Sequence, residues 1–294
     1  MQVDAFTTVP LGGNPCAIVL DADDLDTDTM QAIAREMNLS ETSFVLRSDI
    51  ADVRARYFTP AEEIPLAGHP TIATIHALAE TGHIALTDDR TTISLELQVG
   101  PIPIDIISKN GTLDRVIMTQ KQPAFLDKLP HEAVSAAFGL SAVDFEDRVP
   151  IQVVSTGTPQ LMIAVRSKES LKRVRVDHQE LGQLRVETGF FSTHLFCTEG
   201  VTDRGTTFAR HFAGPPDVFE DPFTGSATGG MAAFLWRYGL IDDPSFVAEQ
   251  GHWMHRPGSA DVEVAGPRDN IESVRVGGPA VTILRGELCL DGKR

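Results

Sequence analysis

The stretch Glu63-Ile64-Pro65-Leu66-Ala67-Gly68-His69-Pro70-Thr71 decides the fold, because the chain contains it twice. The second copy, Glu220-Asp221-Pro222-Phe223-Thr224-Gly225-Ser226-Ala227-Thr228, keeps the Glu, Pro, Gly and Thr of the first in the same places. An apolar run follows each copy and ends at a glycine, Gly82 or Gly239. This pattern predicts a turn that leads into the N-terminus of a short buried helix. Free backbone N–H groups and the helix dipole suit such a start to binding an anion.

The similarity between the two halves extends upstream of these turns. Ala55-Arg56-Tyr57-Phe58 precedes the first turn, and Ala209-Arg210-His211-Phe212 precedes the second. Earlier still, Gly13-Asn14-Pro15 and Gly157-Thr158-Pro159 each lead into an apolar run. Three shared motifs in the same order indicate a duplicated domain rather than chance. Duplicated halves usually pack about a pseudo-two-fold axis, so we expect the two turns to face each other across a cleft between domains, a preferred place for ligands.

The order of the segments predicts an α+β fold of two pseudo-symmetric lobes, each with one central helix wrapped by antiparallel strands. The central helices are expected at His69 to Glu80 and at Ser226 to Tyr238, because their apolar residues occur on nearly all sides. We assign residues 1–120 to the first lobe and residues 121–279 to the second, with a last strand at 280–290 that can return to the first lobe.

Composition excludes several classes of partner. The 294 residues carry a formal net charge of −16, which argues against nucleic acid and anionic membranes, since both need a basic surface. A small anionic substrate stays compatible, because local N–H groups can hold it. The first residues lack the basic segment and apolar core of a signal peptide, and no apolar run approaches membrane-spanning length, so we expect a cytoplasmic protein. Cys16, Cys197 and Cys289 show no metal or redox spacing.

Five motifs distributed over nearly the whole chain form a specific combination. They are Gly13-Asn14-Pro15, Asn38-Leu39-Ser40-Glu41-Thr42, Phe58-Thr59-Pro60, Gly68-His69-Pro70-Thr71 and Glu220-Asp221-Pro222-Phe223-Thr224-Gly225-Ser226-Ala227. This combination resembles the phenazine-biosynthesis isomerase (PhzF-like) family. The resemblance implies the diaminopimelate-epimerase-like fold, in which each lobe is a barrel-like sheet around a central helix. It also implies a cofactor-free proton-transfer site between the lobes, and a homodimer.

The resemblance assigns catalytic roles to four polar residues. Glu41, in the Ser-Glu-Thr sequence, matches the general acid/base of the family, and His69 matches its site histidine. Asp221 and Ser226 match the remaining polar site residues. Taken alone, each has a simpler interpretation: Glu41 as a solvated turn carboxylate, His69 as a structural or exposed helix residue, Asp221 as a turn residue before proline, and Ser226 as a helix cap.

The two turns themselves are expected to bind the substrate, because their glycines let the backbone approach a ligand closely. The expected substrate-binding residues are Gly68, Pro70, Thr71, Gly225 and Ala227. Glu62, on the loop before the first turn, has no expected role, so we expect it to serve as a control carboxylate.

The residues before the two turn glycines favour one type of proton transfer. Two-base epimerases of this fold carry a thiol at those positions, where this chain has Ala67 and Thr224. We therefore expect a single carboxylate to move a proton between two carbons of a small carboxylate-bearing substrate, which is a 1,3 shift. The substrate carboxylate would dock on the helix starts. The chain has no nucleotide-binding glycine pattern and no clustered metal ligands, so we expect neither a cofactor nor a metal.

Two other functions stay open at this point. One is an epimerase or racemase of the same fold, in which Glu41 works with Asp221 or His69 as the opposing base. The other is a protein that retains the fold and the cleft but binds a small ligand or a partner without catalysis. Incorporation of solvent deuterium into a substrate separates the enzymes from the binding protein.

Overall fold

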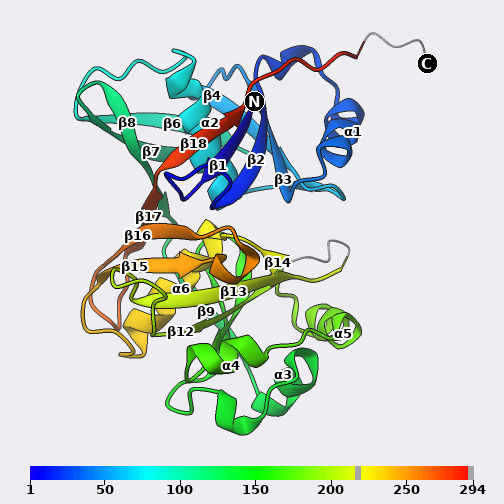
Figure 1. Cartoon of the computed structure of the whole chain (residues 1–294), viewed down its shortest axis with the longest axis vertical. Helices are drawn as coiled ribbons and strands as arrows, with labels where there is room; N and C mark the ends of the chain where they lie inside the picture. Colours follow the sequence, from blue (N-terminus) through cyan, green and yellow to red (C-terminus); the bar gives the residue numbers. More distant parts are fainter. Residues whose placement is uncertain (216–219, 291–294) are drawn as a thin grey trace.

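Two lobes stacked along the long axis make up the molecule (Figure 1). The computed structural model describes residues 1–215 and 220–290. Each lobe wraps a mainly antiparallel sheet around one central helix, which is α2 (Gly68–Glu80) in one lobe and α6 (Gly225–Arg237) in the other. The predicted α+β fold with two pseudo-symmetric lobes is confirmed, and both helices begin one residue earlier than the sequence indicated.

The strands follow the same order in the two halves of the chain. The first series contains β1 (Gln2–Ala5), β2 (Asn14–Val19), β3 (Glu41–Leu46), β4 (Val53–Phe58), β5 (Glu63–Ile64), β6 (Arg90–Leu97), β7 (Gly100–Lys109), β8 (Thr112–Gln120) and β9 (Ala124–Leu129). The second contains β10 (Ile151–Ser155), β11 (Pro159–Ala164), β12 (Ser192–Cys197), β13 (Thr207–Ala213), β14 (Glu220–Asp221), β15 (Ser245–Gln250), β16 (Gly258–Ala265), β17 (Ser273–Gly278) and β18 (Ala280–Leu284). The parallel pairs β2–β3 and β4–β6 recur as β11–β12 and β13–β15, so the sheet repeats the duplication of the sequence.

The last strand of each series crosses to the other lobe. β9 pairs antiparallel with β10, and β18 pairs antiparallel with β1. β17 also pairs with β8, where the two lobes meet in Figure 1. The strand expected at residues 280–290 ends at Leu284, because its partner there is Gln2, the first residue of β1.

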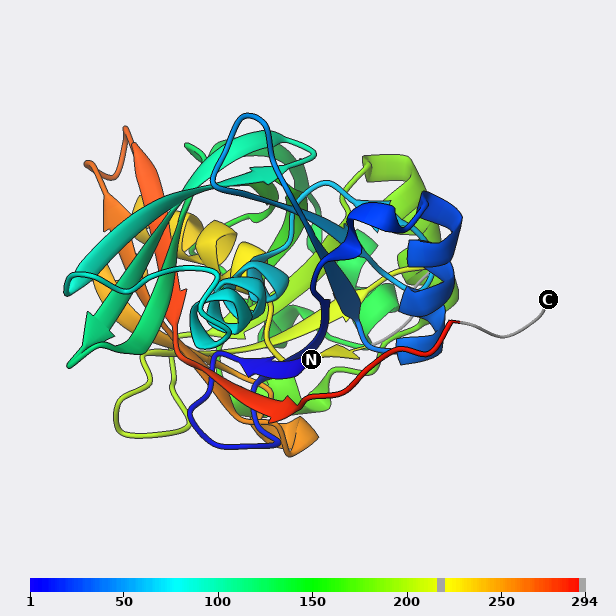
Figure 2. The ribbon, with the colours of Figure 1, turned by 90° about the horizontal axis from the view of Figure 1, so that it is seen from above.

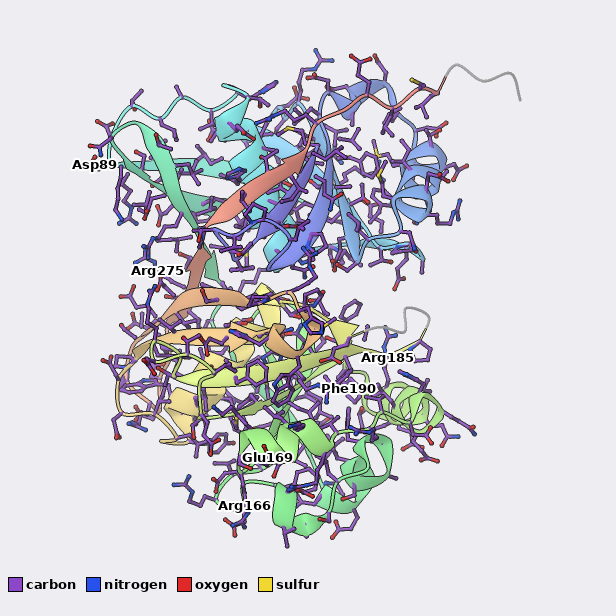
Figure 3. The ribbon with its side chains drawn as sticks, in the orientation of Figure 1. Asp89, Arg166, Glu169, Arg185, Phe190 and Arg275 are labelled. Atoms are coloured by element: carbon purple, nitrogen blue, oxygen red, sulfur yellow. The ribbon has the colours of Figure 1, made fainter. Side chains whose placement is uncertain are left out.

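Ion pairs add to the junction between the lobes. Arg275 of β17 lies at this junction (Figure 3), with Nη2 3.4 Å from Oδ2 of Asp105 on β7. Its Nη1 donates to Glu263 of β16 at 3.0 Å, while Arg90 Nη2 donates to the Asp105 carboxylate at 2.6 Å. Ion pairs near a surface contribute only about 0–1 kcal/mol, so the strand pairing does more to join the lobes.

The other helices pack outside the central sheets. They are α1 (Thr27–Met37), α3 (His131–Phe138), α4 (Lys168–Arg173) and α5 (His178–Thr188). α1 connects β2 to β3, and α4 with α5 connects β11 to β12, since a parallel strand pair needs a crossover of this kind. Asp26 caps α1 by accepting a hydrogen bond from the Thr29 backbone N–H at 2.8 Å. Within the described ranges, every helix is too short or too polar to cross a membrane.

The two central helices meet end to end in the core. Figure 2 shows α2 seen nearly along its axis, with strands around it. A Cβ atom on Gly68 would lie 2.7 Å from the Ser226 backbone nitrogen and 2.9 Å from Gly225 Cα. Glycine is needed at position 68 because the backbone of the other helix start occupies the space that a side chain would fill.

We predict that Gly68→Ala lowers the free energy of unfolding by roughly 1–3 kcal/mol, because the added methyl group meets backbone atoms that cannot rotate away. Urea denaturation of the two proteins measures this change. Gly182→Ala is the matched control, since its Cβ would lie 3.4 Å from Pro215 and the substitution should stabilise α5 by about 0.5–1 kcal/mol. A Gly68→Ala protein as stable as the wild type would contradict the close approach of the helix starts.

Candidate functional site

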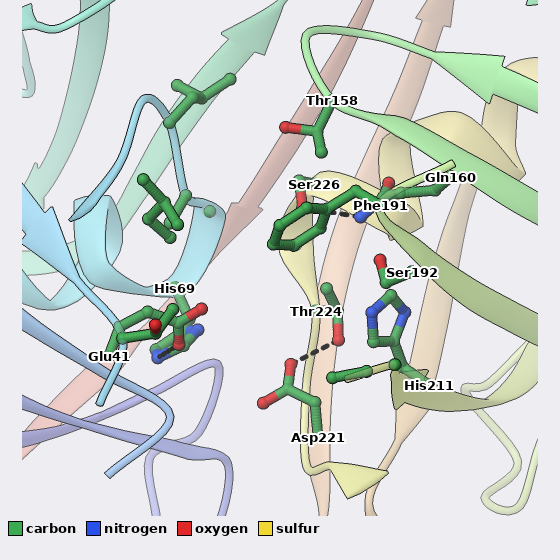
Figure 4. Close-up of a pocket in the computed structure, with 18 of the residues that line it drawn as sticks. Glu41, His69, Thr158, Gln160, Phe191, Ser192, His211, Asp221, Thr224 and Ser226 are labelled. Carbon is green, nitrogen blue, oxygen red and sulfur yellow. Dashed lines mark hydrogen bonds and ion pairs between the residues drawn. The ribbon is translucent and has the colours of Figure 1, made fainter. Parts of the chain in front are cut away.

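The meeting point of α2 and α6 adjoins a cavity between the lobes (Figure 4). The residues that line it are Glu41, Thr59, Glu62, Ile64, Leu66, Ala67, Gly68, His69, Thr158, Gln160, Arg185, Phe191, Ser192, His211, Ala213, Gly214, Asp221, Thr224, Gly225 and Ser226. Glu41 and His69 lie on one side of the cavity in Figure 4, while Gln160, Ser192 and His211 lie on the other. Both repeated turns therefore contribute to one cavity.

Neither helix start at this cavity is capped by the side chain of its N-cap residue. The N-cap residues Ala67 and Thr224 make no side-chain hydrogen bond to their helices, and neither first turn contains an acidic residue. The first N–H groups of a helix have no partner within the helix, and they carry the positive end of its dipole. Two such starts directed at one volume make a site suited to a carboxylate.

Glu41 and His69 form the polar part of the first-lobe wall. Glu41 is the first residue of β3, and its side chain is 16% exposed. Its Oε2 lies 3.2 Å from Nε2 of His69, the second residue of α2. Burial lowers the pKa of His69 to about 3, although a hydrogen bond with the Pro15 backbone opposes the shift. His69 is therefore neutral near pH 7, and it offers Glu41 a dipole rather than a full charge.

Asn14, which the sequence analysis quoted only as part of a motif, connects the two turns. Its Nδ2 lies 2.9 Å from His69 Nδ1 and 2.7 Å from Asp221 Oδ1. The same atom donates to the Phe223 carbonyl oxygen at 2.7 Å. Because an amide nitrogen only donates, its contact with His69 Nδ1 is a hydrogen bond in the tautomer whose proton resides on Nε2, the atom that lies 3.2 Å from the Glu41 carboxylate.

Asp221 is a second carboxyl group in the cavity, and it is almost completely buried. Its Oδ2 accepts a hydrogen bond from the Thr224 hydroxyl, and its backbone carbonyl accepts one from Gln250 Nε2 at 2.6 Å. Burial raises the pKa of Asp221 to about 7, and hydrogen bonds from Thr224, Asn14 and Ser40 offset only part of that rise. The carboxyl group is therefore partly protonated near neutral pH.

The second lobe supplies a wall that the sequence analysis did not identify. Ser192 occupies in β12 the place that Glu41 occupies in β3, as the matching parallel pairs show. Gln160 also lines this wall, and its Nε2 donates to Ser226 Oγ at 3.2 Å. Burial lowers the pKa of His211 to about 3, so this third member of the wall is neutral too. The two walls are equivalent in position but differ in charge.

Comparison with known proteins identifies the family. A family model described as phenazine biosynthesis-like protein matches residues 3–286, which is nearly the whole chain. The chain belongs to the PhzF-like phenazine biosynthesis family.

Relatives of this PhzF-family chain are named isomerases. A trans-2,3-dihydro-3-hydroxyanthranilate isomerase from Pseudomonas chlororaphis is 34% identical over 290 residues, which cover 98% of each chain. An uncharacterized isomerase from Bacillus subtilis is 34% identical over 266 residues, covering 90% of this chain and 89% of the relative. The crystal structure of a PhzF-family protein from Bacillus anthracis matches with a TM-score of 0.86 at 33% identity over 98% of each chain. The chain is therefore an isomerase with the diaminopimelate-epimerase-like fold.

The cavity of this PhzF-family isomerase brings together most of the residues expected from the sequence. Those that line it are Glu41, Gly68, His69, Asp221, Gly225 and Ser226. Pro70, Thr71 and Ala227 do not line the cavity, because their buried side chains lie behind the turns, where the Thr71 hydroxyl donates to the Ala67 carbonyl at 2.7 Å. Glu62 does line it, so Glu62 is not a suitable control carboxylate.

Among residues 1–215 and 220–290, no group of three His, Cys, Asp or Glu side chains is arranged to hold a metal ion. His76 and His83, further along the chain from His69, each contact a threonine hydroxyl. His76 Nε2 lies 3.2 Å from Thr282 Oγ1, and His83 Nδ1 lies 2.8 Å from Thr81 Oγ1. We therefore assign these histidines no metal-binding role.

Asp221→Asn should flatten the pH dependence of stability. The folded pKa of about 7 lies above the ordinary value of 3.8, so the contribution of Asp221 to stability is fully present below pH 4 and is lost as the pH rises through 7. The variant lacks this loss, which amounts to at most about 4 kcal/mol between pH 4 and pH 8. Asparagine can keep both side-chain hydrogen bonds, because its amide offers an acceptor to Asn14 and a donor to Thr224.

Urea denaturation at a series of pH values tests this prediction. The exposed Asp269→Asn is the control, and it should retain the wild-type dependence. If Asp221→Asn unfolds with the same pH dependence as the wild type, then Asp221 is already ionised at low pH in the folded protein.

Proposed function

We propose that the chain is a cofactor-independent isomerase that catalyses a 1,3 proton shift on a small carboxylate-bearing substrate, with Glu41 as the general acid/base. The observation that carries this proposal is the asymmetry of the cavity. Glu41 lies 3.2 Å from neutral His69 on one wall, and a serine, Ser192, takes its place on the other. A carboxylate at only one of these two equivalent positions fits a group that removes a proton and returns it to the same face of the substrate.

The helix starts would hold the substrate carboxylate at the N–H groups of Gly68 and Gly225. When Glu41 takes a proton from the first carbon, the C–H electron pair forms a double bond to the middle carbon, and the pair of the original double bond moves to the far carbon and the conjugated carboxylate, which thereby take up negative charge. Fixed N–H donors stabilise that charge most effectively, because they need no reorganisation during the reaction. The neutral carboxylic acid of Glu41 then gives its proton to the far carbon, which restores the ionised base.

His69 and Asn14 would orient the base during this cycle. His69 Nε2 lies 3.2 Å from one oxygen of Glu41, and the Asn14 amide would favour the tautomer of His69 that carries its proton on this nitrogen. The Asn14 side-chain amide also donates a hydrogen bond to the Asp221 carboxylate, so the two lobes share one polar network. Since His69 stays neutral, it does not remove the charge that Glu41 needs as a base.

A second candidate is an epimerase in which Asp221 acts as the opposing base. The observation in its favour is that Asp221 lines the same cavity and has a pKa raised to about 7, close to the operating pH of a general base. The position of deuterium taken up from D₂O separates the reactions. A 1,3 shift leaves the label that the Glu41 carboxyl acquires by exchange with D₂O on the far carbon, whereas epimerisation leaves it on the original carbon with inverted configuration.

We predict that Glu41→Gln folds and binds ligand but loses turnover by at least about 10²–10⁴-fold, because the amide has the same volume and cannot take up a proton. The first substrate to test is trans-2,3-dihydro-3-hydroxyanthranilate, from which the Pseudomonas chlororaphis relative takes its name. Turnover and deuterium incorporation are measured together by NMR.

Glu36→Gln is the matched control, because Glu36 is exposed on α1 outside the cavity. It should retain wild-type turnover. Label exchange at the wild-type rate in Glu41→Gln would show that Glu41 is not the base, and Asp221 would then be the residue to substitute.

Activity should also survive exhaustive dialysis against EDTA. The proposed mechanism takes its base from Glu41 and its charge stabilisation from backbone N–H groups, so it needs no added group. Turnover is compared before and after dialysis, with metal content measured by mass spectrometry. A stoichiometric metal whose removal abolishes turnover would contradict cofactor independence.

A further inference from the structure

One arginine of the second lobe holds the loop between β1 and β2 of the first lobe. Arg256 lies just before β16, and its Nη2 donates to the Gly12 carbonyl oxygen at 2.8 Å. Its Nε donates to the Gly13 carbonyl oxygen at 2.9 Å, and Nη2 also donates to Asp4 Oδ1 at 2.7 Å. A guanidinium is a planar, rigid fork, so these three hydrogen bonds fix the orientation of the loop as well as its position.

Asp4 completes this clamp between the lobes. Its side chain is 1% exposed, and its Oδ2 accepts a hydrogen bond from the Leu11 backbone N–H at 2.8 Å. Burial raises the pKa of Asp4, and the Arg256 guanidinium opposes that rise. Removing the cation would leave a buried carboxylate without its counter-ion, which destabilises a protein. A substitution that keeps a positive charge at position 256 therefore separates the ion pair from the hydrogen bonds to the loop.

The clamp reaches the peptide bond that leads into β2. Gly13 has a φ of +52°, in the left-handed region that glycine adopts at little cost. Its N–H donates to the Pro257 carbonyl oxygen at 3.0 Å, while its own carbonyl oxygen accepts from Arg256. That carbonyl belongs to the planar peptide bond between Gly13 and Asn14. Arg256 therefore fixes the plane from which the Asn14 side chain departs.

Asn14 is the residue that joins the two turns at the cavity. It is fully buried, and a single atom, Nδ2, makes its contacts with both turns. The partners are His69 Nδ1 at 2.9 Å, Asp221 Oδ1 at 2.7 Å and the Phe223 carbonyl oxygen at 2.7 Å. Hydrogen bonds weaken steeply with misalignment, so three acceptors around one nitrogen tolerate little displacement of the Asn14 backbone.

We propose that Arg256 is a positioning residue for proton transfer, which acts by fixing the peptide bond between Gly13 and Asn14. The Asn14 amide is thereby held between His69 and Asp221. The inference rests on the proposed function in that this amide orients the histidine beside the acid/base. Arg256 is not one of the described residues that line the cavity, so it acts through Asn14 rather than on the substrate.

The titration of Asp221 tests this role without a substrate. Burial raises the pKa of Asp221 to about 7, and the hydrogen bond from Asn14 is one of those that oppose the rise. A displaced Asn14 amide should therefore let this pKa rise further. The other titratable or charged groups that line the cavity stay unchanged in every variant, and they are Glu41, Glu62, His69, Arg185 and His211.

Carbon-13 NMR of aspartate-labelled protein measures the pH at which Asp221 takes up its proton, and the absence of one signal in Asp221→Asn assigns it. Arg256→Lys and Asn14→Ala should each raise this midpoint by about 0.5–1 pH unit, which corresponds to one weakened hydrogen bond. Arg256→Lys keeps a cation beside Asp4, so it folds and reports the loss of the planar fork rather than the loss of charge.

Arg268→Lys is the matched control. Arg268 also donates to two backbone carbonyl oxygens, those of Trp236 at 3.2 Å and Ile241 at 2.9 Å, and it lies outside the set of residues that line the cavity. The control should leave both the Asp221 midpoint and turnover at the wild-type values.

Turnover gives a second measurement, with trans-2,3-dihydro-3-hydroxyanthranilate as the first substrate. Arg256→Lys should lower kcat by about 10- to 100-fold and leave KM within about twofold, because the clamp orients the base while the helix starts hold the substrate. In the Asn14→Ala background the same substitution should lower kcat by less than about threefold, because the residue through which it acts is absent.

Four results would overturn the positioning role. They are an unchanged Asp221 midpoint in Arg256→Lys, an equal shift in Arg268→Lys, a shift that Asn14→Ala does not share, and equal losses of kcat with and without Asn14. The titration decides alone where no substrate is turned over. If the midpoint moves as expected while Glu41→Gln keeps its turnover, the base lies elsewhere and the clamp on Asn14 stands.

Discussion

The contact between the starts of α2 and α6 is the constraint on which the rest of the structure depends. Gly68 has no side chain, so the backbone of the Ser226 turn can approach its Cα directly. This approach directs the positive ends of two helix dipoles at one cavity that both lobes enclose. A single helix end at a protein surface contributes about 0.3–1 kcal/mol toward binding an anion, and burial strengthens the effect.

A symmetric scaffold carries an asymmetric set of side chains. The repeated turns place His69 opposite Ser226, and the repeated strands place Glu41 opposite Ser192. Proton transfer by one group needs this difference, because two ionised carboxylates facing each other would raise each other's pKa and compete for one proton. Duplication thus supplies the cavity and the anion-binding ends, while divergence of a few side chains supplies the chemistry.

Burial determines which groups in the cavity carry charge. It lowers the pKa of His69 and His211 to about 3 and raises the pKa of Asp221 to about 7. The histidines are therefore dipoles near neutral pH rather than cations. The net charge of −16 opposes a distant anion, but it acts through water and salt, which screen it beyond about 8–10 Å. Backbone N–H groups act at contact distance, so a protein of this charge can still hold a small carboxylate.

The sequence by itself determined the duplication, the two buried helices and the turns that meet at the cavity, because a repeated Gly-containing turn before an all-round apolar run is a local pattern. Only the tertiary structure decided which side chains reach the cavity. Asn14 contacts Asp221 through packing of the two lobes, and Gln160 lies beside Ser192 through a strand crossover. Pro70, Thr71 and Ala227 lie behind their turns, because a helix start directs successive side chains away from one another. Proximity along the chain shows where a turn is, whereas the direction of each side chain depends on the surfaces that it packs against.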